Sequence, residues 1–309
     1  MTVVAVSGAG GFLGRHLSQE LLARGHRLIA LSRAQLLSPQ LSEILAGVQT
    51  VVHLAARAHV LAEASDDPQA EFRTSNVVLT QALALVAQRV GVQRFIFLSS
   101  AGVLGATSPP EGVAEHAAPH PHDAYTASKL QAEEWLTSQL DARMGLVILR
   151  PPLIYGPGAK GNFMRLLRLA MKGWSLPVGA LRAPRSLVAV RNIVDLIGVL
   201  VADASPVRTT MLVADRETTS VADLYRIGAR EAGHRPWLAP VPPALIRLML
   251  GLSGRSTDVA RLTLPFVLRP QLAQAQFNWV PPYSQQAELR RTARCELDAA
   301  ARADWQGAK

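Results

Sequence analysis

The sequence predicts an α/β protein, a Rossmann-type doubly wound parallel sheet with a smaller C-terminal α/β substrate-binding lobe. Three observations predict this class. A glycine-rich turn separates the first apolar stretch from the first helical one. Short, almost continuously apolar strands then alternate with helices, which is typical of a parallel sheet covered on both faces. After Arg150, prolines and glycines cluster and the elements become shorter.

The first half supplies most of the expected sheet. Residues 3–7 are almost all apolar, so we expect a buried strand there, and the leucine spacing over 12–24 predicts a helix that Gly25 ends. The same patterns predict strands at 26–32, 50–54, 94–99 and 146–149 and helices at 69–90 and 124–143. These elements predict one domain over residues 1–150.

The second half, residues 151–309, is expected to form mainly a substrate-binding lobe that is interwoven with the sheet. Its elements are short and are separated by loops rich in proline and glycine. The pattern predicts helices at 162–172, 191–202 and 220–232 and strands at 186–190 and 210–213.

Composition narrows the possible classes of function. The chain has 309 residues, of which 49% are hydrophobic, enough for a full core. Its formal net charge is +9, but the basic residues are scattered and form no cluster with aromatics, so no nucleic-acid partner is expected. The single cysteine, Cys295, excludes a disulfide framework and a cysteine-based zinc site, and no metal is expected.

Neither a signal peptide nor a transmembrane segment is predicted. The first residues lead directly into a strand, and no stretch reaches eighteen uninterrupted apolar residues. We therefore expect a cytoplasmic protein. Residues 242–252 have helical apolar spacing around Arg247 and fit either a packed helix or a helix that docks on a membrane surface.

The glycine turn predicts a dinucleotide site. Gly8, Gly11 and Gly14 permit a sharp turn, a close approach of the backbone to a pyrophosphate and tight packing of helix on strand. The helix that begins at Phe12 and Leu13 presents N–H groups and a partial positive charge to that anion. Strand, turn and helix occur in the required order, which favours this interpretation over a merely tight turn.

The end of the second strand bears on the choice of cofactor. An acidic residue there would accept the ribose 2′-hydroxyl of NAD, but this chain has Ser32 and Arg33. A hydroxyl and a guanidinium suit a 2′-phosphate, so NADP is favoured over NAD. The alternative is that Arg33 is a solvated surface residue.

Tyr125 and Lys129 lie four residues apart, so they share one face of the helix predicted at 124–143. A phenol with a pKa near 10 is a poor acid–base group at neutral pH, and a neighbouring ammonium together with a positively charged nicotinamide ring is expected to lower that pKa. Ser99 and Ser100 end the preceding strand. In that position, a serine hydroxyl can hydrogen-bond the same substrate oxygen as the phenol.

Taken together, these motifs resemble the extended short-chain dehydrogenases, the family of NAD-dependent sugar epimerases, dehydratases and reductases. The likeness covers nearly the whole chain. It is carried, in the family's order, by residues 7–14 (SGAGGFLG), 53–56 (HLAA), 76–77 (NV), 97–101 (FLSSA), 125–129 (YTASK), 150–157 (RPPLIYGP) and 278–281 (NWVP).

The resemblance implies roles for individual residues. Tyr125 is expected to be the catalytic acid–base group, Lys129 its partner and Ser100 the catalytic hydroxyl. Tyr125 and Lys129 are also expected to contact the cofactor, and Ser100 and Tyr125 the substrate. The resemblance adds Leu54, Ala55, Ala56 and Pro152 to the cofactor-binding residues. It assigns Asn162 and Arg185 to the diphosphate of a UDP-sugar, places Asn76 near the strand of Ser100, and implies a homodimer built on helices 69–90 and 124–143.

The chain departs from the family pattern at two places. Leu153 stands where the family commonly has an asparagine that contacts the sugar nucleotide. The stretch from Arg33 to Gly47 is short and contains no clear third strand, so the adenine pocket is expected to be open or rebuilt by Leu36, Leu37 and Leu41.

A closer likeness, in residues 53–60 (HLAARAHV) and 185–188 (RSLV), is to a bacterial polysaccharide (O-antigen) subgroup. Its members reduce UDP-4-keto-6-deoxy-N-acetylhexosamine to UDP-N-acetylquinovosamine or a relative. We therefore expect an NAD(P)-dependent reductase acting at C4 of a UDP-sugar. The alternatives are a UDP-sugar 4-epimerase, which keeps its cofactor bound, and a non-catalytic dinucleotide sensor.

Overall fold

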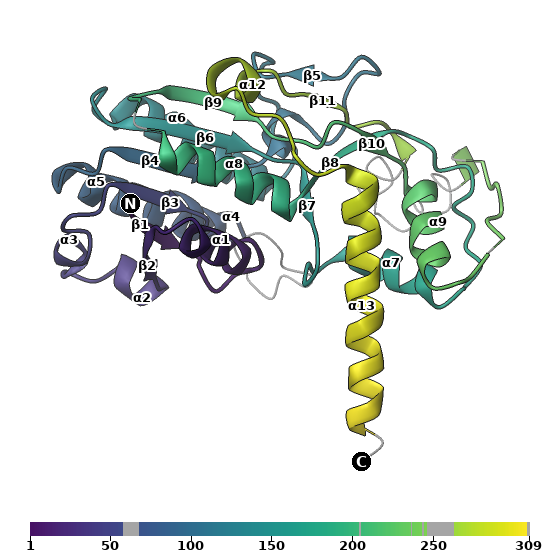
Figure 1. Cartoon of the computed structure of the whole chain (residues 1–309). Helices are drawn as coiled ribbons and strands as arrows, with labels where there is room; N and C mark the ends of the chain where they lie inside the picture. Colours follow the sequence, from purple (N-terminus) through teal and green to yellow (C-terminus); the bar gives the residue numbers. More distant parts are fainter. Residues whose placement is uncertain (58–67, 204, 236, 243, 246–262, 308–309) are drawn as a thin grey trace.

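A computed structural model describes residues 1–57, 68–203, 205–235, 237–242, 244–245 and 263–307. Its centre is a six-stranded parallel sheet in the order β2-β1-β3-β4-β6-β9 (Figure 1). The order reverses at β1, as in a doubly wound α/β fold, so the predicted fold class is confirmed. The strands are β1 (Val3–Ser7), β2 (Arg27–Leu31), β3 (Thr50–His53), β4 (Arg94–Leu98), β6 (Gly145–Arg150) and β9 (Arg208–Leu212).

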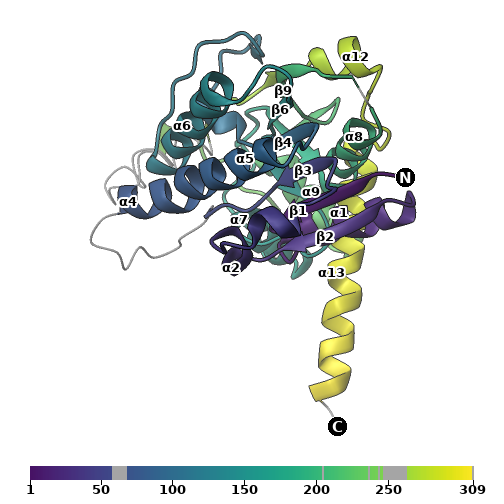
Figure 2. The same ribbon diagram turned by 90° about the vertical axis from the view of Figure 1, so that its left-hand side faces the viewer.

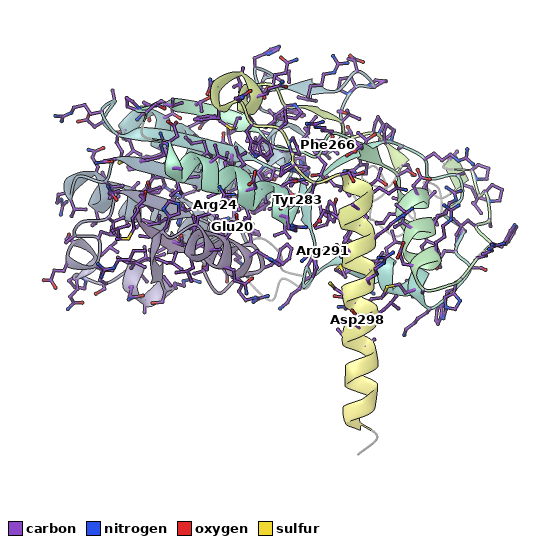
Figure 3. All side chains as sticks on the ribbon, viewed as in Figure 1. Glu20, Arg24, Phe266, Tyr283, Arg291 and Asp298 are labelled. Atoms are coloured by element: carbon purple, nitrogen blue, oxygen red, sulfur yellow. The ribbon has the colours of Figure 1, made fainter. Side chains whose placement is uncertain are left out.

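Helices cover both faces of this sheet. Helices α1 (Phe12–Ala23) and α8 (Val190–Ala202) pack on one face, and α5 (Leu79–Arg89) and α6 (Ala124–Gln139) pack on the other (Figure 2). Because both faces are buried, the strands are apolar throughout instead of alternating. Arg24 ties α1 to α8 through an ion pair of 2.5 Å with Asp195, beside its own-helix partner Glu20 (Figure 3).

The helix predicted over 69–90 is interrupted. It consists of α4 (Pro68–Phe72), a π-helical segment η1 (Arg73–Val78) and α5. A π-helical turn carries one extra residue and often marks a functional site. The helix predicted over 124–143 ends at Gln139, because Leu140 is extended.

Two short helices occupy the stretch where a third strand was missing. Helix α2 (Arg33–Leu36) begins at Ser32, which forms a reciprocal capping box with Gln35, and α3 (Leu41–Ile44) follows. Leu36 and Leu41 are buried in the core, whereas Leu37 is exposed. Of the three leucines expected to rebuild the adenine pocket, Leu36 lines the cavity beside the glycine turn, and Leu37 and Leu41 are not among its lining residues.

The second half forms a smaller lobe beside the sheet and also contributes to the sheet. A three-stranded sheet in the order β10-β8-β7 lies against α7 (Asn162–Met171), α9 (Val221–Glu231) and α13 (Gln285–Gly307). Its strands are β7 (Leu153–Tyr155), β8 (Arg185–Ala189) and β10 (Thr218–Thr219). Helix α8 and strand β9 return to the main sheet, where Leu212 of β9 pairs with Arg150 of β6.

Several smaller elements complete the fold. The parallel pair β5 (Val113–Ala114) and β11 (Leu268–Arg269) joins the two halves, and the short helices are η2 (Ala101–Leu104) and α12 (Leu272–Phe277). Helix α13 begins against the lobe and extends well beyond it (Figure 1). Within the described residues, no helix is both long and apolar enough to cross a membrane. Most of the segment considered above for membrane docking, residues 246–252, lies outside the described residues.

Candidate active site

The glycine turn opens onto a cavity of about 790 Å³ at the carboxyl edge of the sheet. This edge, beside the point where the strand order reverses, is where open α/β sheets bind ligands. The cavity gathers six of the residues predicted to bind the cofactor: Gly8, Gly11, Ser32, Arg33, Ala55 and Ala56. The other described residues that line it are Ala9, Gly10, Ala30, Leu31, Leu36, Arg57, Ser75 and Leu79.

Two glycines leave no room for a side chain. Gly8 has φ +77°, and a Cβ there would lie 2.8 Å from the backbone nitrogen of Ala55. A Cβ on Gly14 would collide with the carbonyl oxygen of Gly8 and would lie 2.7 Å from the Cα of Ala9. The turn is therefore pressed against both α1 and the segment after β3. This close packing is what a backbone cradle for a pyrophosphate requires, so the residues present fit a dinucleotide.

Seven predicted cofactor residues are not among those that line the cavity, including Tyr125 and Lys129 of α6. Leu13 is buried in the core, Leu54 packs against that core, and Phe12 packs against His16 on the α1 side. Pro152, in the loop before β7, is likewise absent from the lining, as is Gly14. Phe12 and Leu13 are the first residues of helix α1, whose first turn carries backbone N–H groups without a partner inside the helix.

Ser32 and Arg33 stand at the cavity rim in different ways. The Ser32 hydroxyl donates to the side chain of Gln35 and accepts from its backbone N–H, so the cap of α2 uses it. Arg33 is exposed and donates one hydrogen bond of 3.3 Å to Ser75 across the cavity. None of the described residues that line this cavity is an aspartate or a glutamate.

Ser100 and Tyr125 meet at the same edge of the sheet. Ser100 follows β4 and accepts a hydrogen bond from the Gly102 N–H at 3.1 Å. Its side chain is also hydrogen-bonded to the Tyr125 phenol. Burial and the Asp123 carboxylate raise the pKa of Tyr125 to about 12, although the bond with Ser100 lowers it. The protein's own groups therefore keep this phenol protonated, and the expectation that Lys129 lowers its pKa is not met.

Lys129 is not among the groups that shift the pKa of Tyr125. Its ammonium is fully buried, donates to the carbonyl oxygen of Leu98 at 2.7 Å and lies 4.6 Å from the centre of the Phe97 ring. Burial lowers the pKa of Lys129 to about 7, although Glu133 raises it. The Lys129 ammonium is thus held by the Leu98 carbonyl and the Phe97 ring.

The neighbouring Ser99 belongs to a different group. Its hydroxyl donates to Glu133, which also binds Arg150 at 2.5 Å, and all three side chains are buried. This cluster ties α6 to β4 and β6 beneath the candidate site. Of the two serines at the strand end, the structure therefore brings only Ser100 to Tyr125.

The residues predicted to hold a nucleotide diphosphate lie in the lobe. Arg185 opens β8, donates to the carbonyl oxygen of Leu264 at 3.1 Å and lies over the Phe266 ring. Asn162 is the exposed first residue of α7, and Gly161 precedes it as the N-cap, so the alternative that Asn162 itself caps the helix is wrong. Leu153 begins β7 with 47% of its surface exposed.

Sequence reasoning missed the hydrogen-bonded row behind the cavity. His53 is fully buried between Ser7 and Thr80, at 2.5 and 2.9 Å, and burial together with Lys129 lowers its pKa to about 3. Asn76 in η1 binds the backbone of Arg57 through both its N–H and its carbonyl. A histidine at the end of the apolar strand β3 was the available signal.

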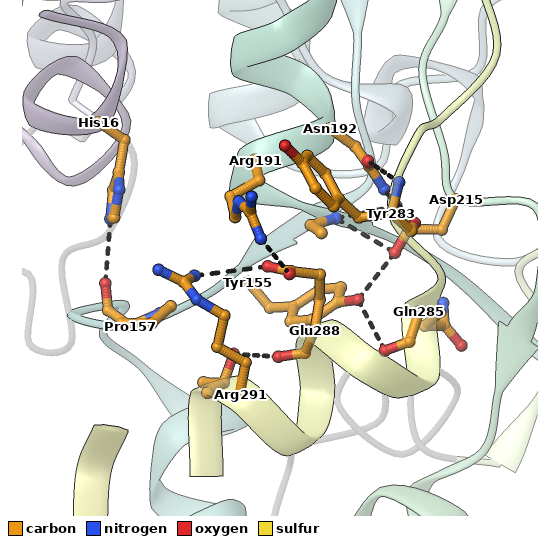
Figure 4. Close-up of polar contacts among 12 residues, drawn as sticks. His16, Tyr155, Pro157, Arg191, Asn192, Asp215, Tyr283, Gln285, Glu288 and Arg291 are labelled. Atoms are coloured by element: carbon orange, nitrogen blue, oxygen red, sulfur yellow. Dashed lines mark hydrogen bonds and ion pairs between the residues drawn. The ribbon is translucent and has the colours of Figure 1, made fainter. Parts of the chain in front are cut away.

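A second buried polar cluster lies under α13 (Figure 4). Tyr155 donates to Asp215 at 2.9 Å, and Asp215 also accepts from Asn192 at 2.7 Å and from the Ala189 N–H at 3.0 Å. Burial raises the pKa of Asp215 despite these donors. Glu288 of α13 lies between Arg191 and Arg291. This cluster binds α13 to α8 and β8 and contributes nothing to the lining of the cavity.

The parallel sheet, with the glycine cradle at its carboxyl edge, defines a dinucleotide-binding protein of the Rossmann class. Residues 4–213 match the model of the NAD dependent epimerase/dehydratase family, and the chain belongs to this family. The predicted resemblance is thereby confirmed.

Individual relatives agree with that assignment. The chain is 33% identical over 317 residues to a UDP-glucose 4-epimerase of Vibrio cholerae, covering 96% of each chain. It is 32% identical over 216 residues to the N-acetyl-alpha-D-glucosaminyl-diphospho-ditrans,octacis-undecaprenol 4-epimerase of Escherichia coli O157:H7, covering 63% of this chain and 61% of that one. The solved structure of MoeE5 in complex with UDP-glucose and NAD superposes with a TM-score of 0.77 at 22% identity, covering 96% and 99% of the chains. That likeness shows the fold alone.

Proposed function

We propose that this protein is an NAD(P)-dependent oxidoreductase that acts at C4 of a UDP-sugar. The observation that carries the proposal is the hydrogen bond between Ser100 and the Tyr125 phenol, one helical turn from Lys129 and at the sheet edge that holds the glycine cradle. A phenol and a second hydroxyl that meet at one point can both bind one substrate oxygen.

In this proposal, the dinucleotide supplies or removes the hydride when it is bound. In the reductive direction, Tyr125 gives its proton to the oxygen on C4, and Ser100 holds that oxygen by a hydrogen bond. The raised pKa of Tyr125 suits this direction, because the phenol begins as a proton donor. Lys129 ties helix α6, which carries the phenol, to strand β4 through its hydrogen bond to the carbonyl oxygen of Leu98.

Substrate selection is assigned to the lobe. Arg185 and Asn162 are proposed to hold the diphosphate, for which a guanidinium fork is suited. Leu153 offers no hydrogen bond and is half exposed. We therefore propose that it packs against an apolar part of the substrate, such as a deoxy carbon or a methyl group.

The composition of the cavity favours a 4-ketoreductase. A reductase must release its oxidised cofactor and take up a reduced one after each turnover. The cavity places Arg33 at its rim and holds no carboxylate among its described residues, which suits the 2′-phosphate of NADP. A UDP-4-keto-6-deoxy-N-acetylhexosamine is the proposed substrate.

A UDP-sugar 4-epimerase is the second candidate, and a specific observation supports it. The relative that matches this chain along 96% of both lengths is a UDP-glucose 4-epimerase. An epimerase uses the same phenol and hydroxyl but retains its cofactor through the catalytic cycle.

One assay separates these candidates. Purified protein is incubated with UDP-glucose, UDP-N-acetylglucosamine and their 4-keto-6-deoxy relatives, with NADH or NADPH, and the products are identified by NMR. A reductase consumes one reduced dinucleotide for each 4-keto sugar, and an epimerase interconverts C4 epimers without net consumption. If cofactor binds but no sugar turns over, the protein is a sensor and the proposal is wrong.

We also propose a homodimer built on the helices around α5 and α6. Val78 and Leu85 are seven residues apart on this helix and expose 45% and 44% of their surfaces. Apolar residues at this spacing share one helical face. Light scattering should give a mass near twice the 33.2 kDa of one chain, and Leu85→Lys should halve it.

A further inference from the structure

The buried row behind the cofactor cavity forms a hydrogen-bond chain with one defined direction. Thr80 donates its hydroxyl proton to the carbonyl oxygen of Asn76 at 2.6 Å. Its oxygen is then an acceptor for His53, whose Nε2 lies 2.9 Å away. His53 must therefore carry its proton on Nε2, which leaves Nδ1 to accept from the Ser7 hydroxyl at 2.5 Å. The Ser7 oxygen accepts in turn from the N–H of Ala55 at 3.3 Å.

Every side chain in this row is shielded from water. Ser7, His53, Thr80 and Asn76 are each 0% exposed. A buried polar group that loses its partner retains the cost of its desolvation, so removing one link weakens the whole row. The row is consequently a rigid part of the structure.

One end of the chain holds the wall of the cavity against the glycine turn. Ala55 lines the cavity, and its backbone nitrogen lies 2.8 Å from where a Cβ on Gly8 would be. At the other end, the Asn76 side chain accepts from the Arg57 N–H at 2.9 Å and donates to its carbonyl at 3.2 Å. The row thus fixes both the beginning and the end of residues 55–57.

The same asparagine reaches the helix of the candidate catalytic residues. Asn76 donates to the Ser128 hydroxyl at 3.0 Å, and Ser128 donates to the carbonyl oxygen of Tyr125 at 2.7 Å. The cavity wall and the first turn of α6 are therefore joined through one side chain in the π-helical segment.

The chain works only with a neutral imidazole. A second proton on His53 would remove the acceptor that Ser7 needs. The Phe97 ring stacks on His53, with 5.9 Å between the ring centres, and the Lys129 ammonium lies 4.6 Å from the centre of the same ring. A second proton on His53 would therefore place two cations against one ring. The charged group that faces His53 is thus itself a cation, and it favours the neutral form.

We propose that Ser7, His53 and Thr80 are positioning residues for the dinucleotide: their directed chain sets the distance between the cavity wall, residues 55–57, and the Gly8 turn. This inference rests on the proposed function, because it presumes that a dinucleotide occupies this cavity. None of the three residues needs to touch the cofactor.

The test measures dinucleotide binding, which requires no knowledge of the sugar. Dissociation constants for NADPH and NADH are measured by fluorescence titration of the full chain, together with the melting temperature. Thr80→Val keeps the shape and removes the hydroxyl, so we expect dinucleotide binding to weaken about tenfold, the effect of one buried hydrogen bond. Thr80→Ser restores the hydroxyl and should return the dissociation constant to within about threefold of the wild type.

Thr74→Val is the matched control. Thr74 lies in the π-helical segment just before the helix of Thr80 and, like Thr80, donates to the carbonyl four residues earlier, at 2.9 Å, but it is exposed. It should bind dinucleotide as the wild type does. Amide hydrogen exchange adds a readout without cofactor: Thr80→Val should speed exchange at residues 55–57, and Thr74→Val should not.

The outcomes are distinct. Thr80→Val protein that is folded and binds dinucleotide with the wild-type constant overturns the inference, even if its melting temperature falls, because the row is then merely structural. If Thr80→Val does not fold, Ser7→Ala, with Ser7→Thr as its rescue, decides by the same criterion. Wild-type protein that binds neither dinucleotide refutes the proposed function itself.

Discussion

Two buried polar clusters in this molecule invite comparison. The row from Ser7 to Asn76 is built from hydroxyls, an imidazole and an amide, and it ends at the wall of the cofactor cavity. The cluster under α13 is built around the buried carboxylates of Asp215 and Glu288, and the partly exposed guanidiniums of Arg191 and Arg291 pair with Glu288 (Figure 4).

The comparison shows that the first cluster positions the wall of the ligand cavity, whereas the second holds helices together. A neutral, directed row costs little desolvation and holds backbone segments at fixed distances. A charged cluster is costly to bury and is strongly destabilised when one partner is removed. We therefore expect changes in the first region to alter binding and catalysis, and changes in the second to alter stability.

Substituting a tyrosine in each region should give the largest contrast. Tyr125→Phe removes the proposed proton donor and should lower kcat about a thousandfold, within the range for lost general acid–base catalysis. Tyr155→Phe removes a phenol bonded to Asp215 and should lower the free energy of unfolding by about 1 kcal/mol without changing kcat. Steady-state kinetics measure kcat, and thermal melts measure the loss of stability. Equal kcat values for the two variants would contradict the proposed difference between the two regions.

Asp215→Ala should test the stabilising role of the charged cluster. It leaves the donors of Tyr155, Asn192 and Ala189 without their acceptor, so we expect a loss of about 3 kcal/mol in the free energy of unfolding. Urea denaturation measures this loss. The control Asp298→Ala, on the projecting part of α13, should change stability by less than about 0.5 kcal/mol (Figure 3). Weaker dinucleotide binding by folded Asp215→Ala protein would show that the two regions are coupled.

Arg33→Ala tests whether Arg33 binds the 2′-phosphate of NADP in the cavity. Removing a guanidinium that meets a phosphate costs about 1.4 kcal/mol or more, so NADPH should bind at least tenfold more weakly. NADH, which lacks the 2′-phosphate, should bind as before. Fluorescence titration with both dinucleotides gives the ratio, and an unchanged ratio would mean that Arg33 is only a solvated surface residue.

The smallest expected effect is a bend in the pH profile. Because burial lowers the pKa of Lys129 to about 7, the ammonium is lost as pH rises through that value. The catalytic rate should therefore decline above about pH 7, by no more than tenfold per pH unit. Lys129→Arg keeps its charge at these pH values, so its profile should lack the bend. A wild-type rate that is flat from pH 6 to 9 would contradict this assignment.

Much of the fold was predictable because local signals agreed with each other. The spacing of Gly8, Gly11 and Gly14 predicts a turn that needs glycine for steric reasons. The almost continuously apolar strands predict a sheet that is buried on both faces. Ser100 and Tyr125 could be paired in advance, because each stands at a position that the parallel fold brings to one edge.

Other features depend on contacts between distant residues and left weaker traces. The bonds of His53 to Ser7 and Thr80 span 46 and 27 residues, and no local pattern specifies them. The π-helical segment contains no glycine or proline that would mark an interruption of the helix. The pKa of Tyr125 depends on burial and on Asp123, so the presence of Lys129 in the motif did not give its direction.

The return of the chain to the edge of the sheet has a consequence for biosynthesis. Strand β6 pairs with β9, which begins only at Arg208, and helix α8, which covers the neighbouring core, also follows the first strands of the lobe. A nascent polypeptide that has emerged only as far as Arg150 therefore carries an apolar strand with one unpaired edge, on a sheet that still lacks helix α8 on one face. Fragments cut at that point should aggregate, and the two halves of this protein should have to be made, and to fold, together.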